Sequence, residues 1–201
     1  MIVNVSNIIG FVLFAFVTSV TPGPNNLLLF RQGKRCGLKG TGMLMAGISF
    51  GFSSMLILTG LGLGKLFVEN KTVYLVLKII GSIWLLYLAI SIAFSKESVS
   101  DKNTNIYGFY KGFFMQYVNP KAWVMAISCT AAYIPTNGNI YINVLVYTVL
   151  FAIIGLPCMI LWAKLGDIIS LIINTDRVHD IVNYILGFLL VISVVLMWFN
   201  V

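Results

Sequence analysis

Segments without Asp, Glu, Lys or Arg alternate along the chain with short charged ones. The uncharged segments are residues 1–30, 40–64, 79–95, 122–163 and 181–200. The 42 residues of 122–163 exceed one membrane crossing, and a run rich in Pro, Asn and Gly at 133–139 divides them. Since about 20 apolar residues cross the hydrocarbon core as a helix, the pattern predicts six crossings, the fourth starting near Tyr107. Five crossings with one re-entrant segment are the alternative.

The predicted fold is an all-α membrane protein with six transmembrane helices. Backbone polar groups in lipid need partners inside the protein, so only helices and closed barrels cross it. The apolar runs lack the strict alternation of barrel strands, which favours helices. We expect a single transmembrane domain over residues 1–201, with a three-helix half at 1–104 and a second at 105–201.

The composition argues against soluble classes of protein. Hydrophobic residues make up 59% of the chain and charged residues 9%, whereas a soluble domain carries about 25% charged residues. Three cysteines without C-x-x-C spacing indicate neither a disulfide framework nor a thiol oxidoreductase. Nucleophile–base pairs, phosphate loops and paired carboxylates are absent from the sequence. We therefore expect no enzyme, no cofactor and no bound metal.

The net charge of +7 comes from basic residues that lie between the apolar segments. This distribution favours a lipid bilayer over a nucleic acid as partner, and it leaves open whether the chain forms a homo-oligomer. Nine Lys and Arg fall in or beside loops one, three and five, against three in loops two and four. That excess places the odd loops in the cytoplasm and both termini outside it. The first 30 residues hold no Lys or Arg, so we expect a retained helix instead of a signal peptide.

A Pro-rich run interrupts the first apolar segment at Thr21-Pro22-Gly23-Pro24-Asn25. Two prolines around a glycine cannot continue a helix, because each removes a donor and clashes with the preceding turn. Pro24 suits the first turn of a new helix, and Thr21 and Asn25 are capping types. We predict a discontinuous first helix whose freed carbonyls and N–H groups face protein or a watery cavity.

The fourth predicted helix contains a second break at Asn119-Pro120, followed by Lys121. Lys121 lies 13 residues after Gly108, about 20 Å along a helix, which is too deep for its ammonium to reach the interface. The ammonium must therefore find carbonyls, a carboxylate or water. Lys121 is either a substrate contact or a clamp on the carbonyls freed at the first break, and the two roles can coexist.

The two breaks occupy corresponding places in the two predicted halves. Pro22 and Pro120 are 98 residues apart, and the same shift carries the second and third apolar segments onto the fifth and sixth. Each half has three crossings, an odd number, so the second half is inverted relative to the first. Paired interrupted helices in inverted halves predict a transport site where the halves meet.

Three further features have plainer interpretations. Asp167, at the cytoplasmic end of the fifth segment, is the carboxylate nearest to the membrane, and it is either a proton-coupling group or an ordinary helix-end charge. Gly47 and Gly51 have the spacing that lets helices pack closely. Scattered aromatic residues, Trp162 among them, are typical of lipid-facing or interfacial positions.

These motifs together resemble the LysE/RhtB family of amino-acid exporters. Thr-Pro-Gly-Pro-Asn at 21–25 is similar to the family's first-helix motif, and residues 78–88 and 112–122 are similar to its third and fourth helices. The glycines that lead into the second helix are similar too, at Gly37, Gly40, Gly47 and Gly51. The resemblance implies a protein of the bacterial cytoplasmic membrane that exports amino acids or related small zwitterions, with the proton gradient as its drive.

The hypothesis for the site joins the breaks to this function. The helix that starts near Pro24 offers unpaired N–H groups to a substrate carboxylate, and carbonyls near Thr21 and Pro22 receive the substrate ammonium. Asn25 and Asn119 orient the substrate, while Lys121 pairs with its carboxylate or holds the broken backbone. The predicted site is Thr21, Pro22, Gly23, Pro24, Asn25, Asn119, Pro120 and Lys121, with Asp167 as the candidate for proton coupling. Export of another small solute or cation, or a non-transporting membrane partner or channel subunit, is the alternative.

Overall fold

The computed structural model describes residues 5–63, 69–94, 107–172 and 176–199. All the secondary-structure elements in these ranges are helical. Three of the charges behind the predicted topology, Lys65, Lys96 and Lys102, lie outside the described residues, as does the boundary between the halves at 104 and 105.

The helices are interrupted where the sequence predicts. In chain order they are α1 (Val5–Val20), α2 (Pro24–Cys36), η1 (Lys39–Thr41), α3 (Gly42–Leu58), η2 (Thr59–Leu63), α5 (Lys71–Ala93), α6 (Phe109–Val118), α7 (Pro120–Tyr133), α8 (Ile140–Ile172) and α9 (Asp176–Phe199). Both Pro breaks are confirmed, between α1 and α2 and between α6 and α7. The division of the long apolar segment is also confirmed. Helix α7 ends before Ile134-Pro135, and Asn139 caps α8 by accepting a hydrogen bond from the Tyr141 N–H at 3.0 Å.

Several of these helices have the length and apolar character of membrane spans. Residues Lys39–Leu63, Ile140–Leu171 and Asp180–Phe199 are each long and apolar enough to cross a bilayer, and α1 and α2, bent by 51°, make a fourth span if they count as one. Lys78–Ala93 in α5 is a shorter apolar helix. The all-helical membrane fold is thus confirmed, while six crossings in two inverted halves stay a prediction.

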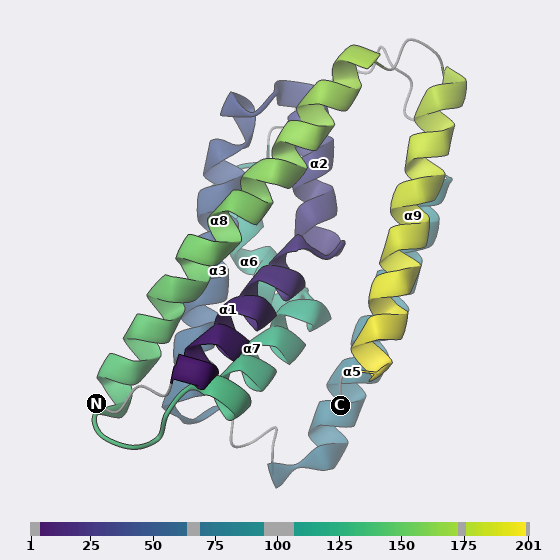
Figure 1. Cartoon of the computed structure of the whole chain (residues 1–201). Helices are drawn as coiled ribbons and strands as arrows, with labels where there is room; N and C mark the ends of the chain where they lie inside the picture. Colours follow the sequence, from purple (N-terminus) through teal and green to yellow (C-terminus); the bar gives the residue numbers. More distant parts are fainter. Residues whose placement is uncertain (1–4, 64–68, 95–106, 173–175, 200–201) are drawn as a thin grey trace.

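Glycines hold the helix pairs at close distance. A Cβ at Gly33 of α2 would overlap the carbonyl of Ala163 in α8, and a Cβ at Gly47 of α3 would overlap the carbonyl of Phe109 in α6. Gly187 of α9 lies against α5, where a Cβ would stand 2.8 Å from the Ala89 carbonyl oxygen. Figure 1 shows α5 and α9 side by side at one edge of the bundle, with α8 running diagonally beside α1. The start of α1 and the end of α9 lie at the same end of the bundle.

Trp162 departs from its predicted lipid-facing position. Its side chain is buried in α8, and its indole Nε1 donates a hydrogen bond to the Val20 carbonyl at 3.0 Å. The physical reason is the break itself, because the end of α1 leaves carbonyls without intrahelical partners and a buried indole N–H supplies one.

Candidate functional site

At the first break, side chains from several helices bind the carbonyls at the end of α1. The chain is extended at Gly23 (φ −176°, ψ 175°), and Pro24 begins α2. The Asn26 Nδ2 donates to the Ser19 and Thr21 carbonyls, both at 2.8 Å. The Pro22 carbonyl accepts a hydrogen bond from the Ser193 hydroxyl of α9. The first break is therefore stabilised from outside as well as from within its own segment.

The second break is stabilised mainly by its own residues. Asn119 (φ −89°, ψ 108°) separates α6 from α7, and its Oδ1 accepts from the Lys121 N–H at 3.1 Å. The Trp123 Nε1 donates to the Tyr117 carbonyl at 2.9 Å. Pro120 starts α7 and packs on α5, where a Cβ at Gly81 would overlap its ring.

Lys121 connects the second break to the first. Its ammonium Nζ donates to the Thr21 carbonyl and to the Thr21 hydroxyl, both at 2.9 Å, and to the Pro22 carbonyl at 3.0 Å. An ammonium has three donors, so these three oxygens use all of them. Its side chain passes over Gly23, where a Cβ would lie 2.9 Å from the Lys121 Cδ. These are the contacts expected of a clamp, and a direct role of Lys121 in substrate binding stays a prediction.

Three side-chain amides form a second link between the breaks. Asn25 and Gln116 exchange hydrogen bonds, Nδ2 to Oε1 at 2.7 Å and Nε2 to Oδ1 at 3.0 Å. The Asn119 Nδ2 also donates to the Asn25 Oδ1, at 3.2 Å. Gln116 is fully buried and donates in addition to the Gly112 carbonyl of its own helix at 3.0 Å. Asn25 is thus the shared partner of both amides from the second break.

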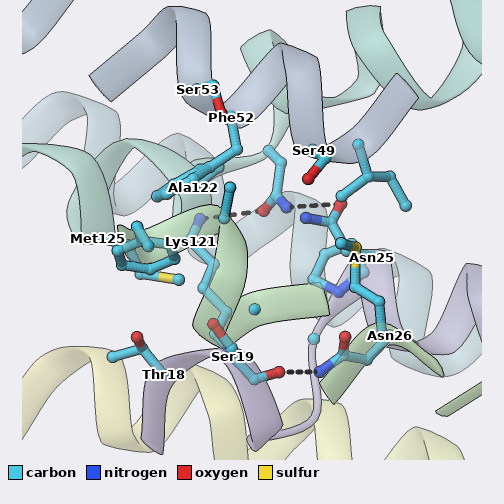
Figure 2. Close-up of a pocket in the computed structure, with 18 residues that line it drawn as sticks. Thr18, Ser19, Asn25, Asn26, Ser49, Phe52, Ser53, Lys121, Ala122 and Met125 are labelled. Atoms are coloured by element: carbon cyan, nitrogen blue, oxygen red, sulfur yellow. Dashed lines mark hydrogen bonds between the residues drawn. The ribbon is translucent and has the colours of Figure 1, made fainter. Parts of the chain in front are cut away.

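A cavity lies beside the two breaks. Five of the eight predicted site residues line it: Gly23, Pro24, Asn25, Asn119 and Lys121. Thr21 and Pro22 contribute through their bonds to Lys121, and Pro120 adjoins them in the chain. Figure 2 shows Ser49, Phe52 and Ser53 of α3 on one side of the cavity and Thr18 and Ser19 of α1 on the other, with Lys121 between. The paired breaks are therefore brought together around a single space.

The wall of this cavity is apolar with a few polar groups. Of the described residues that line it, Lys121 alone is charged, and none is Asp or Glu. The hydroxyl groups come from Thr18, Ser19, Ser49 and Ser53, and the large apolar side chains from Ile48, Phe52, Met125, Phe151 and Met159. Within the described ranges, no three His, Cys, Asp or Glu side chains are grouped as a metal site would need. One cation, several hydroxyls and an apolar wall suit a small polar molecule.

Asp167 does not line the cavity. It lies near the end of α8, where its Oδ2 accepts a hydrogen bond from the Leu38 N–H at 3.4 Å. A Cβ at Gly37 would stand 3.3 Å from its Oδ1, so the carboxylate is packed on the connection between α2 and η1. Its role in proton coupling stays a prediction.

Two contributors were missed by sequence reasoning. Gln116 belongs to the same short run as Asn119 and Lys121, and a buried amide within an apolar helix was the signal that could have identified it. Ser193 had no comparable signal, because one serine in an apolar helix is common and its partner is 171 residues away in the chain.

Comparison with known proteins agrees with this geometry. The family model of the LysE type translocator matches residues 16–198. The cysteine/O-acetylserine efflux protein of Salmonella choleraesuis is 27% identical over 160 residues, which cover 79% of this chain and 82% of that protein. The protein of the same name from Klebsiella pneumoniae is 29% identical over 160 residues, covering 79% and 81% of the two chains. No solved structure matches the chain.

The match extends over the C-terminal end of α1, over α2 to α8 and over most of α9, so both breaks and the cavity beside them fall inside it. The relatives are named as efflux proteins, and none of these names is that of an enzyme. The chain therefore belongs to the LysE type translocator family and is a membrane transporter.

Proposed function

We propose that this protein exports small neutral amino acids across the bacterial cytoplasmic membrane, driven by the proton gradient. The observation that carries the proposal is the cavity beside the two breaks, where Lys121 is the one charged residue among the described lining residues. A free amino acid carries a carboxylate and an ammonium close together. The cavity has groups suited to both.

The carboxylate of the substrate binds at the start of α2. The first N–H groups of a helix have no intrahelical partner and attract negative charge, and the N-cap residue Gly23 has no side chain to occupy them. The side-chain amides of Asn25 and Asn119, which bond to each other beside the start of α2, orient the carboxylate. By contrast, the Asn119 side chain already caps α7, so α2 is the available helix start.

The ammonium of the substrate binds the oxygens that Lys121 now occupies. The Thr21 carbonyl, the Thr21 hydroxyl and the Pro22 carbonyl hold one ammonium through three hydrogen bonds. An amino acid offers a second ammonium of the same shape. Substrate binding therefore displaces Lys121 from these oxygens, which makes Lys121 a clamp in the empty protein and a mobile group in the loaded one.

The side chain of the substrate is small and uncharged. The cavity wall around it combines the Ser49 and Ser53 hydroxyls with the apolar side chains of Phe52 and Met125. A lysine or arginine substrate would add a side-chain cation to the site, and none of the described lining residues is a carboxylate that could offset it, so its binding has an unfavourable electrostatic energy. The relatives from Salmonella choleraesuis and Klebsiella pneumoniae are named for cysteine and O-acetylserine, which are both small and neutral.

Alternating access follows from the two halves. The six predicted crossings form two inverted three-helix halves, with the odd loops in the cytoplasm and both termini outside. Rocking of one half against the other opens the cavity to each side in turn. The bonds from Lys121 to Thr21 and from Gln116 to Asn25 join the halves, so they are the contacts that change partners during this motion.

Release of amino acids from cells fed with dipeptides tests the proposal. Cells that express the protein take up dipeptides, hydrolyse them, and release the excess amino acids, which are then quantified across about twenty residue types. We expect faster release of alanine, serine or cysteine than of lysine or arginine. Lys121→Ala and Asn119→Ala abolish this release while the protein still inserts in the membrane.

Lys111→Ala is the matched control. Lys111 is a lysine of α6 whose ammonium lies over the Tyr107 ring, 5.0 Å from its centroid, and it does not line the cavity. Its alanine variant retains release. Equal release from cells with and without the protein, for all amino acids, would refute amino-acid export.

A further inference from the structure

The proposed proton drive requires a group that binds a proton when the substrate site is empty and gives it up when the site is loaded. Two candidates exist near the membrane-spanning helices, the Asp167 carboxylate and the Lys121 amine. Asp167 is bonded to the backbone of Leu38 at the end of α8. Of the α8 residues that line the cavity, Met159 is the nearest to Asp167 in the chain. It lies eight residues before Asp167, about 12 Å along the helix. Asp167 therefore has no direct contact through which a bound substrate could move its proton.

We infer that Lys121 is the proton carrier, and that the substrate ammonium and the Lys121 ammonium exclude each other from the oxygens of Thr21 and Pro22. The inference rests on the proposed function. Its basis is that one ammonium engages all three oxygens at 2.9–3.0 Å, while the Thr21 and Pro22 carbonyls each accept a second hydrogen bond, from Asn26 and Ser193. Two cations within a few ångströms of each other in a site of low dielectric constant repel strongly. The loaded site therefore holds the substrate ammonium and a neutral Lys121 amine.

The charges and the proton balance over one cycle. On the cytoplasmic side the substrate zwitterion enters, its ammonium takes the three acceptors, and the proton of Lys121 leaves to cytoplasmic water. The loaded protein, with a neutral amine and a net neutral substrate, opens outward. There the substrate leaves and Lys121 takes a proton from external water, which restores the ammonium on Thr21 and Pro22. One proton moves inward for each amino acid that moves outward.

None of the described residues that line the cavity beside Lys121 is a carboxylate that could hold it permanently as an ion pair. The six carboxylates of the chain are Glu69, Glu97, Asp101, Asp167, Asp176 and Asp180, and none falls within residues 1–68 or 102–166. The three acceptors of the Lys121 ammonium are neutral oxygens, so another ammonium can take its place on them without a salt bridge to these groups being broken.

Other titratable groups lie on the helices packed around Lys121. Helices α1, α3 and η2 contain no titratable residue. On α5, the ammonium of Lys78 lies over the Trp198 ring of α9, 4.9 Å from its centroid, and on α6 the Tyr117 hydroxyl bonds to Ser54 at 2.7 Å. The remaining titratable groups of these elements and of the adjoining helices are Arg31, Lys34, Arg35 and Cys36 on α2, Lys71, Tyr74 and Tyr87 on α5, Tyr110 and Lys111 on α6, Cys129 and Tyr133 on α7, Tyr141, Tyr147, Cys158, Lys164 and Asp167 on α8, and Asp176, Arg177, His179, Asp180 and Tyr184 on α9.

Purified protein in lipid vesicles separates proton coupling from substrate binding. The vesicles contain labelled alanine, serine and cysteine, the last kept reduced, and a pH-sensitive dye. Exchange is measured at equal pH with the same unlabelled amino acids outside, since it needs no return of the empty protein. Coupled efflux is measured with an acidic outer medium. For the wild type we expect efflux to rise at least tenfold under the pH gradient, with about one proton entering per amino acid released.

Variants of Lys121 test whether it carries the proton. Lys121→Gln exchanges more slowly than the wild type but still above protein-free vesicles, which shows that the variant is folded, and it loses both proton entry and the acceleration by the pH gradient. Lys121→Arg keeps a charge that cannot be released, so it loses exchange as well. Lys111→Gln is unchanged in every measurement. Asp167→Asn keeps proton entry.

Three outcomes would overturn the inference. Proton-coupled efflux by Lys121→Gln would assign the proton to another group. So would a loss of proton-coupled efflux in Asp167→Asn while Lys121→Gln keeps it. Wild-type exchange without any proton entry removes the inference and leaves amino-acid export intact. Absence of both exchange and efflux in the wild type refutes the proposed function, and the inference is refuted with it.

Discussion

The two broken helices satisfy their freed backbone groups in different ways. At the second break the residues involved are its own, since Asn119 caps α7 and Trp123 binds the Tyr117 carbonyl. At the first break, carbonyls at the end of α1 depend on other helices, with Lys121 from α7, Trp162 from α8 and Ser193 from α9. The second break is therefore held mainly by its own residues, whereas the first is held by neighbouring helices as well as by Asn26 of its own segment.

This difference indicates which break changes during transport. Bonds within one segment persist when helices move as rigid bodies, whereas bonds between helices are broken and remade. The first break offers both an uncapped helix start at Gly23 and carbonyls whose donors come from elsewhere. It is the place where a substrate can replace a protein group, and the second break supplies the side chains that do the exchanging.

After Lys121→Ala and Asn119→Ala, the largest effect is expected from Asn25→Ala, because Asn25 is the first-break partner of both amides of the second. The change removes the bonds to Gln116 and Asn119 and leaves the fully buried Gln116 amide without them. An unsatisfied buried polar group costs about 1–3 kcal/mol. If that cost falls on the transport-competent arrangement, export falls by about tenfold or more, as measured by amino-acid release from dipeptide-fed cells.

Asn70→Ala is the control for this variant. Asn70 caps α5 by accepting from the Val73 N–H at 3.3 Å, at an exposed position away from both breaks. It has the same change in composition and only a small expected effect on release. Release from Asn25→Ala within a factor of two of the wild type would show that the amide link between the breaks is dispensable.

A smaller effect is expected from Gly23→Ala, which tests whether Lys121 needs the space above the first break. The added Cβ would lie 2.9 Å from the Lys121 Cδ and 3.0 Å from its Nζ, so the flexible side chain must shift. A side chain pushed off its preferred rotamer costs about 0.5–1.5 kcal/mol, which corresponds to a loss of export of about two- to tenfold. The extended φ of −176° at Gly23 is open to alanine, so the backbone itself is not strained.

Gly108→Ala is a matched control, because Gly108 is also an extended N-cap glycine, in front of α6, and a Cβ there would meet nothing within 4 Å. Export is measured for both variants beside their amounts in the membrane. Equal export by the two would mean that the position of Lys121 over Gly23 has no part in transport.

The positions of the breaks were predictable because proline acts locally. Pro24 and Pro120 each begin a helix, as a residue without an N–H donor does well at the first helical position. The depth of Lys121 also followed from counting residues, and with it the need of its ammonium for carbonyls, a carboxylate or water. These arguments use only the chain near each residue.

The partners of the breaks could not be predicted, because they depend on which helices pack together. Gly47 and Gly51 were recognised as packing residues, but nothing in their spacing identified α6 as the neighbour. Trp162 was placed toward lipid for the same reason, since a tryptophan in an apolar helix has no local mark that distinguishes a lipid-facing ring from one bound to a carbonyl. The contacts between halves are tertiary, and the sequence carries no period that encodes them.

The smallest effect is expected from Ser193→Ala, which removes one of the two side-chain donors to the Pro22 carbonyl. The Pro22 carbonyl then keeps only the Lys121 ammonium at 3.0 Å. A neutral hydrogen bond contributes about 0.5–1.5 kcal/mol, and because a carbonyl that retains one partner is not left unsatisfied, the low end of that range applies. We expect export to fall about twofold, and Ser170→Ala, which loses only a local bond to the Asp167 carbonyl at 2.6 Å, to match the wild type. If Ser193→Ala instead reduced export more than Asn25→Ala, the first break would depend mainly on α9, and the amide link to the second break would be secondary.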